Sequence, residues 1–186
     1  LTHASIDQIS KIKELVTNVK IVHFVRQPRH MLCSSLQYAK TSNEKWLHII
    51  RKEYGEKTLQ EFLCSLSNKE GLIYLINNRS PNVRNMMEIQ IKCNPYFVKL
   101  EELSWDTSLR VYYDLLRFLN IEGEELLAGL RLFCKHALWN TGIVTHSTGG
   151  VQKSLPSYFD FEVENEFLRK FRKNSTEFEK EIYASN

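Results

Sequence analysis

The segment that most constrains the fold is an apolar run, a proline and an amphipathic stretch, VKIVHFVRQPRHMLCSS at residues 19–35. Val19–Val25 is short and rich in β-branched and aromatic residues, which is typical of a strand buried on both faces. Pro28 ends this strand, and the apolar spacing behind it predicts a helix over Arg29–Lys40. We therefore expect a strand that runs through a tight turn into a helix. In open parallel sheets, ligands bind beyond the carboxyl ends of such strands.

The rest of the chain is mostly of helical periodicity. A second short strand, YFVKL, is expected at Tyr96–Leu100. Strands joined by helical crossovers form a parallel sheet, so the predicted fold class is α/β. Two strands are few for a full sheet, so either the sheet is small or its other strands lie upstream of Leu1. The helices are expected over Ile6–Val16, Glu44–Gln90 with a turn at Asn77–Pro81, Asp106–Asn120, Glu124–His136 and from Glu162 onward, with a loop over Asn140–Pro156.

Length, charge and composition limit the classes of protein to which this chain can belong. A length of 186 residues fits a single domain over 1–186, and the net charge of +3 is too mild to imply a nucleic-acid partner. No run approaches the roughly 20 apolar residues of a membrane span, so none is expected. The cysteines lack any CxxC pair, which argues against zinc, and they are either free thiols or two disulfides. They are Cys33, Cys64, Cys93 and Cys134.

Two polar residues in the opening segment suit a phosphate. Arg26 stands at the carboxyl end of the first strand, and Ser34 lies about two turns into the next helix. A guanidinium offers a planar fork for phosphate oxygens, and a serine hydroxyl adds a further hydrogen bond. A salt bridge at Arg26 and a helix-lining role for Ser34 explain the residue types equally well, so both interpretations stay open at this point.

The run R-Q-P-R-H-M-L-C-S resembles the 3′-phosphate-binding motif of sulfotransferases that use 3′-phosphoadenosine 5′-phosphosulfate. That motif has Arg, a polar residue, Pro, and Ser eight positions after the Arg; Gln27 departs from its usual Asp or Asn. FVKLEELSWD at Phe97–Asp106, and the helix SLRVYYDLLRFLNI behind it, are similar to the family's next strand and helix. The resemblance implies a P-loop-NTPase-like parallel sheet flanked by helices, incomplete at its N-terminal side. It also implies that Arg26 and Ser34 grip the nucleotide's 3′-phosphate.

Two further segments resemble the same family. HSTGGVQKSLPSYF at His146–Phe159 looks like the late loop that closes over the nucleotide, with the amides of Gly149 and Gly150 and the Lys153 ammonium holding phosphate oxygens. A plain surface turn is the alternative for that loop. The pair Thr2-His3 resembles the cytosolic branch's catalytic pair, which implies that His3 takes the acceptor proton. The other histidines show no metal-ligand spacing, so no metal is expected.

The function that the resemblance implies is transfer of a sulfonyl group to a hydroxyl or amine of a small-molecule or carbohydrate acceptor. No G-x-x-x-x-G-K-[ST] run exists in the sequence, so it looks like the carboxyl-terminal two-thirds of the domain, and we expect little or no activity from this chain alone. A non-catalytic sulfotransferase-like binding module is the alternative; a nucleotide kinase would need the missing loop even more. Thr2-His3 favours a cytoplasmic location, whereas IVHFVRQPR also resembles Golgi-lumen carbohydrate sulfotransferases. The sequence does not indicate an oligomeric state.

Overall fold

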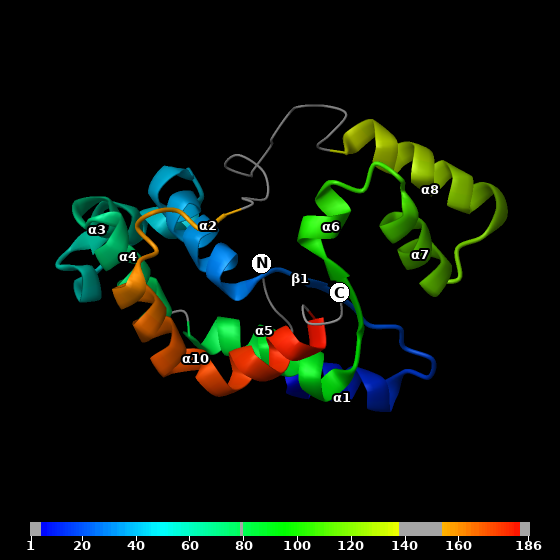
Figure 1. The fold of residues 1–186 in the computed structure, drawn as a ribbon, viewed down its shortest axis with the longest axis horizontal. Helices are drawn as coiled ribbons and strands as arrows, with labels where there is room; N and C mark the ends of the chain where they lie inside the picture. The colour runs from blue at the N-terminus through cyan, green and yellow to red at the C-terminus, as the bar shows by residue number, and fades with distance from the viewer. Residues whose placement is uncertain (1–4, 79, 138–153, 183–186) are drawn as a thin grey trace. The chain divides into compact units, whose positions relative to one another are not determined.

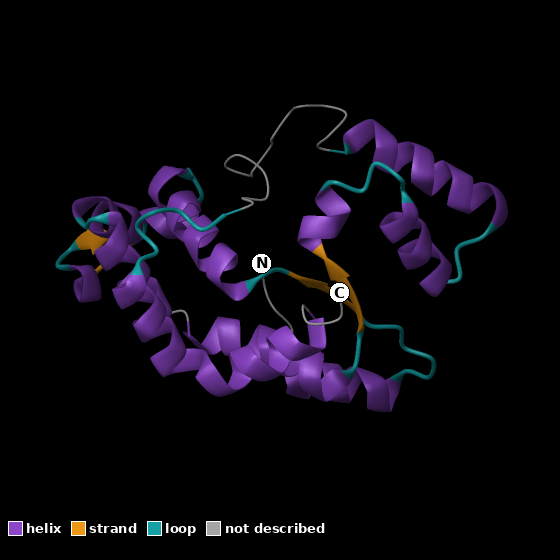
Figure 2. Cartoon of the chain, viewed as in Figure 1, coloured by secondary structure: helices purple, strands orange, loops and turns teal. Residues whose placement is uncertain are grey.

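The computed structural model describes residues 5–78, 80–137 and 154–182 (Figure 1). This part of the chain mixes helix and strand and is mostly helical (Figure 2). The chain divides into two compact units, residues 1–26 with 85–151 and residues 27–84 with 152–186. Helix α5 (Ser80–Cys93) begins in the second unit and ends in the first. A single domain over 1–186 stays a prediction.

The first unit is built on two parallel strands, β1 (Val22–Val25) and β4 (Tyr96–Lys99), drawn in orange in Figure 2. They pair in register from Val22 opposite Tyr96 to Val25 opposite Lys99. The predicted parallel pairing is therefore confirmed, with a sheet that has two strands within the described residues. Both strands are shorter than predicted, since β1 starts three residues later and Leu100 already opens helix α6 (Leu100–Ser104).

The prediction that the first strand is buried on both faces is wrong. Val25 is fully buried, but Phe24 is 48% exposed. Alternation along the strand puts Phe24 on the same face as Tyr96 of β4. There Tyr96 stacks on Phe118 of α7 (Arg110–Phe118), with 4.5 Å between ring centroids. Helix α7 therefore covers this face of the sheet at the amino-terminal ends of the strands. Phe24 lies further along β1, beyond the stacked rings of Tyr96 and Phe118.

Helices flank the strands of the first unit. On the opposite face of β1, His23 Nδ1 lies 3.1 Å from Gln90 Oε1 of α5. Helix α7 packs against α8 (Gly123–His136), where Tyr112 stacks on Phe133 with 4.2 Å between centroids. Helix α1 (Ile6–Leu15) begins with a capping box between Ser5 and Gln8, which satisfies amides of its first turn.

The second unit is a group of packed helices. They are α2 (Pro28–Thr41), α3 (Leu59–Ser65), α4 (Asn68–Asn78) and α10 (Phe161–Ile182). Helix α2 packs on α3 and α4, and α4 packs along α10 (Figure 1). The apolar stripes predicted for these helices supply the buried side chains, among them Leu32, Leu36, Leu72, Ile76, Phe167 and Phe171.

The helix predicted from Glu44 onward is wrong in its first part. Here the chain forms two 3₁₀ turns, η1 (Lys45–His48) and η2 (Lys52–Tyr54), and a small antiparallel pair, β2 (Ile50–Arg51) with β3 (Lys57–Thr58). Gly55 has φ +68°, in the left-handed region that ends helical structure and that glycine adopts without strain. The β-branched Ile50 favours the strand.

Candidate functional site

The connection from β1 to α2 is two residues long, Arg26 and Gln27. Pro28 occupies the first helical position, where its fixed φ suits a helix and its missing N–H costs nothing. The residue before a proline avoids the helical region, and Gln27 is indeed extended, with ψ 124°. The predicted passage from strand through a tight turn into a helix is therefore present, with α2 beginning one residue earlier than expected.

Arg26 is the last residue of the first segment of the first unit, and one of its side-chain atoms suits a ligand. Its Nε is buried and has no hydrogen-bond partner among the described residues. A buried guanidinium N–H that stays unpaired is unfavourable, because desolvation is not repaid by a hydrogen bond. Such an atom is suited to an anionic ligand, for which guanidinium is the preferred fork.

Arg29, three residues later, is used differently. Its Nε and Nη2 donate to the two carboxylate oxygens of Glu164, each at 2.8 Å. Its guanidinium carbon also lies 4.3 Å from the centroid of the Phe167 ring. Both partners lie on α10, so Arg29 joins two helices of the second unit. Arg29 therefore has a structural partner, Glu164, whereas Arg26 is the residue predicted to bind phosphate.

Ser34 lies half-buried on α2, in the second unit. Because Arg26 belongs to the first unit, their joint grip on one phosphate stays a prediction. One turn beyond Ser34, Gln37 Nε2 donates to the Tyr158 hydroxyl at 3.0 Å. Tyr158 lies near the end of the predicted late loop, His146–Phe159, so this end of the loop contacts α2. His3, Gly149, Gly150 and Lys153 lie outside the described residues.

Glu101 and Glu102, which follow the second strand, lie on α6. Glu102 Oε1 lies 3.0 Å from Lys99 Nζ, and Lys99 is almost fully buried at the end of β4. The carboxylate therefore compensates a desolvated ammonium.

All four cysteines are free thiols, with Cys33 buried and Cys64 exposed, which decides between the two alternatives that the sequence left open. Among the described side chains, no group of three His, Cys, Asp or Glu could hold a metal ion. None of the helices in the described ranges is both long enough and apolar enough to cross a bilayer.

The sequence analysis missed a cavity in the second unit. It has a volume of about 430 Å³ and is lined by side chains from η1, η2 and α4, among them Trp46, Tyr54 and Tyr74. The apolar spacing of Trp46 and Tyr54 also fits one face of a helix, which hid the cavity from periodicity alone.

No protein-family model, curated protein or solved structure matches this chain.

Proposed function

We propose that this chain binds the 3′-phosphate of an adenosine nucleotide as part of a sulfotransferase of P-loop-NTPase-like fold. The observation that carries the proposal is the buried Nε of Arg26 at the carboxyl end of β1, which has no hydrogen-bond partner in the part of the chain that the structure describes. Parallel sheets bind ligands at this edge, and a buried guanidinium N–H without a partner gains a charge-assisted hydrogen bond from a phosphate. The contact of Tyr158 with Gln37 supports it further, because the end of the late loop then lies against the helix that carries Ser34.

The proposed reaction transfers a sulfonyl group from 3′-phosphoadenosine 5′-phosphosulfate to a hydroxyl or amine of a small-molecule or carbohydrate acceptor. The acceptor oxygen or nitrogen forms a bond to sulfur while the bond from sulfur to the 5′-phosphate oxygen breaks. The acceptor proton goes to His3, and adenosine 3′,5′-bisphosphate leaves. Arg26 and Ser34 hold the 3′-phosphate, and Gly149, Gly150 and Lys153 contact phosphate oxygens. Positioning and charge stabilisation supply the catalysis, in the cytoplasm or, as the alternative, in the Golgi lumen.

Calorimetric titration with adenosine 3′,5′-bisphosphate tests the nucleotide site. We expect saturable binding that Arg26→Ala and Ser34→Ala each weaken at least about tenfold, because each removes a charged or polar contact to phosphate. Adenosine 5′-monophosphate, which lacks the 3′-phosphate, should bind no better to the wild type than to Arg26→Ala. The exposed Arg131→Ala, which removes the same charge from α8, is the matched control and should bind normally. Equal binding by Arg26→Ala and the wild type would exclude the proposal.

A second function, a non-catalytic nucleotide-binding module, is favoured by the missing G-x-x-x-x-G-K-[ST] run. Both functions predict nucleotide binding through Arg26, so binding alone does not separate them. Incubation with ³⁵S-labelled cofactor and a panel of hydroxyl and amine acceptors favours the enzyme if label is transferred and His3→Ala abolishes the transfer. Absence of transfer by this chain alone is expected for both functions, because the sequence lacks the loop that would hold the phosphosulfate.

A further inference from the structure

Helix α8 packs on α7 along one side, and both helices belong to the first unit (Figure 1). A Cβ built on Gly129 would lie 3.0 Å from Leu116 Cδ1 of α7, and one turn later Phe133 stacks on Tyr112. The half-buried residues of α8 that share the spacing of one helix face are Leu126, Gly129, Leu130 and Phe133. This packing fixes which side of α8 is turned away from α7.

The side of α8 opposite to these residues is exposed, and it is both charged and apolar. We call it the outward face, and it consists of Glu124, Leu127, Ala128, Arg131, Leu132 and Lys135. An acid in the first turn and a base in the last turn suit the helix dipole. The leucines have no such reason to be there, because Leu127 is 54% exposed and Leu132 is 58% exposed. They indicate a face that a partner covers.

The order of charges on the outward face is complementary to a second α8 that runs in the opposite direction. Its central row is formed by Glu124, Ala128, Arg131 and Lys135, at spacings of four, three and four residues. A twofold axis midway between residues 129 and 130 places Glu124 of each copy opposite Lys135 of the other. Arg131 lies one turn from Lys135 and adds a second cation near the same carboxylate. Each chain thus supplies both halves of two equal ion pairs.

The uncharged residues of the outward face fit the same arrangement. Ala128 lies near the twofold axis, and its small side chain lets two helices approach closely. Leu127 and Leu132 flank the central row on opposite sides, so across the axis each packs beside its counterpart in the other copy. A parallel pair would place Glu124 against Glu124 and Lys135 against Lys135, which like-charge repulsion disfavours.

We propose that a second copy of this chain covers the outward face, in a symmetric and antiparallel pair of α8 helices. The interface goes beyond the proposed nucleotide site and uses none of its residues. A single pair of 14-residue helices is small beside the roughly 1,200–2,000 Å² of standard interfaces. We therefore expect a weak dimer, with a dissociation constant of the order of 100 µM.

Sedimentation equilibrium of the full chain, from about 1 µM to about 1 mM, tests the proposal. We expect the average mass to rise with concentration towards twice that of one chain, and to rise less at high salt, which screens the ion pairs. Leu132→Ser should weaken the dimer at least about tenfold, because each dimer loses two buried leucines. Leu15→Ser is the matched control, since Leu15 is exposed on α1 and lies outside the outward face. No nucleotide is present, so failure of the nucleotide site does not affect the result.

A pair of charge reversals tests the antiparallel geometry. Glu124→Lys places two ammonium groups opposite each other, and Lys135→Glu places two carboxylates opposite each other. Each variant alone should therefore dimerise at least about tenfold more weakly than the wild type. An equal mixture of the two variants restores opposite charges at both ends of the helix pair, so it should associate as the wild type does. Association of the mixture also shows that both variants are folded, and circular dichroism checks the fold of Leu132→Ser.

Three results would overturn the proposal. The first is the mass of a single chain at every concentration, which is also the result if another part of the chain or a different partner covers this face. The second is a dimer that Leu132→Ser and both charge reversals leave intact. The third is a mixture of Glu124→Lys and Lys135→Glu that associates no better than either variant alone.

Discussion

Arg29 and Glu164 meet in two parallel hydrogen bonds of 2.8 Å, which tie the first turn of α2 to the first turn of α10. Their side chains are only 14% and 32% exposed, so water screens the pair less than it screens an ion pair on the surface. The fork geometry and the adjacent Phe167 ring add to the attraction. This pair accounts for why the second unit needs an arginine at residue 29, independently of any ligand.

Glu164→Ala should therefore lower the free energy of unfolding by about 1–3 kcal/mol, because it leaves a partly desolvated guanidinium without its partner. Urea unfolding followed by circular dichroism measures the loss. Glu162→Ala is the matched control, since Glu162 lies two residues away with a side chain 66% exposed, paired with Lys69. Equal losses in the two variants would show that the Arg29 pair contributes no more than a surface contact.

The close approach of α2 to α4 depends on Gly71. A Cβ built on Gly71 would lie 2.8 Å from Leu36 Cδ1, and Leu36 is fully buried with little room to move. Gly71→Ala gains about 1 kcal/mol of helix propensity but overpacks the contact at about 1–3 kcal/mol, so we expect a net loss of stability. In a double-mutant cycle, Leu36→Val should destabilise Gly71→Ala less than it destabilises the wild type. Additive effects would contradict the contact.

These contacts show what the sequence could and could not predict. The helices that carry Leu36, Leu72 and Phe167 followed from apolar spacing, because each buries one continuous stripe against its neighbours. The exposure of Phe24 did not, since a strand's burial depends on which helices cover it and not on its own residues. The residues around Trp46 and Tyr54 share helical spacing but fold as 3₁₀ turns, because Gly55 and the β2–β3 pair override that periodicity.

The candidate site was predictable to a similar degree. The strand, turn and helix around Pro28 came from local rules of backbone geometry. The pairing of Arg29 with Glu164 could not come from such rules, because Glu164 lies 135 residues from Arg29 along the chain.

Asp106 organises the start of α7 and is 6% exposed. Its Oδ1 accepts from the Arg110 amide at 3.1 Å and its Oδ2 from the Tyr112 amide at 3.2 Å, which satisfies amides of the first turn. Asp106 thus caps α7 from a position ahead of the helix, with Leu109 as the residue that directly precedes it. Asp106→Ala should cost about 1–2 kcal/mol of stability, and Asp106→Asn less. Urea unfolding measures both.

Asp114→Ala is the matched control, because it removes the same charge from an exposed position of α7. A loss for Asp114→Ala as large as that for Asp106→Ala would assign the effect to charge and not to the amide contacts.

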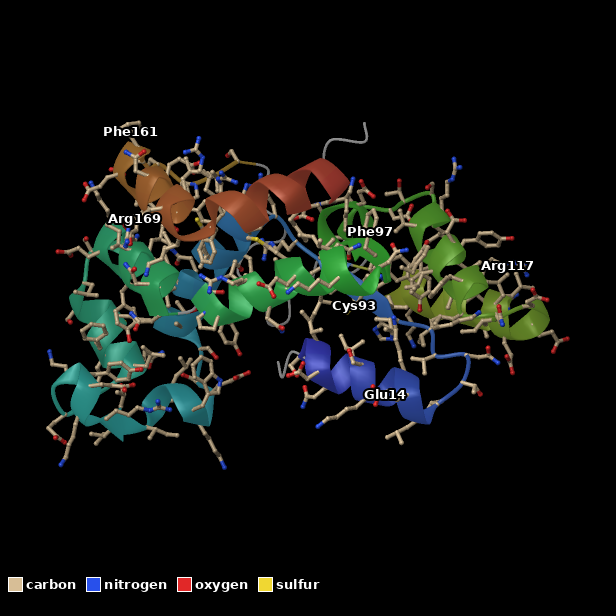
Figure 3. The ribbon with its side chains drawn as sticks, turned by 90° about the horizontal axis from the view of Figure 1, so that it is seen from below. Glu14, Cys93, Phe97, Arg117, Phe161 and Arg169 are labelled. Carbon is tan, nitrogen blue, oxygen red and sulfur yellow. The ribbon has the colours of Figure 1, made fainter. Side chains whose placement is uncertain are left out.

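Glu166 on α10 gives the chain a pH dependence in the acid range. Arg169, labelled in Figure 3, donates to both of its carboxylate oxygens, and this lowers the pKa of Glu166 from 4.5 to about 2. A carboxyl whose folded pKa is lowered contributes stability that is present above pH 4.5 and is lost as the pH falls towards 2. We expect the unfolding free energy of Glu166→Gln to fall less steeply than that of the wild type across this window.

The pKa itself is measured by ¹³C NMR titration of the Glu166 carboxyl. Arg169→Gln should raise it markedly towards its ordinary value, because the hydrogen bonds from Arg169 are the largest cause of the shift. Lys170→Gln should raise it less, since Lys170 acts only through charge at longer range and ranks last among the causes. A Glu166 pKa that Arg169→Gln leaves near 2 would show that the Arg169 guanidinium does not lower it. The pH dependence of the unfolding free energy would then have another cause on α10.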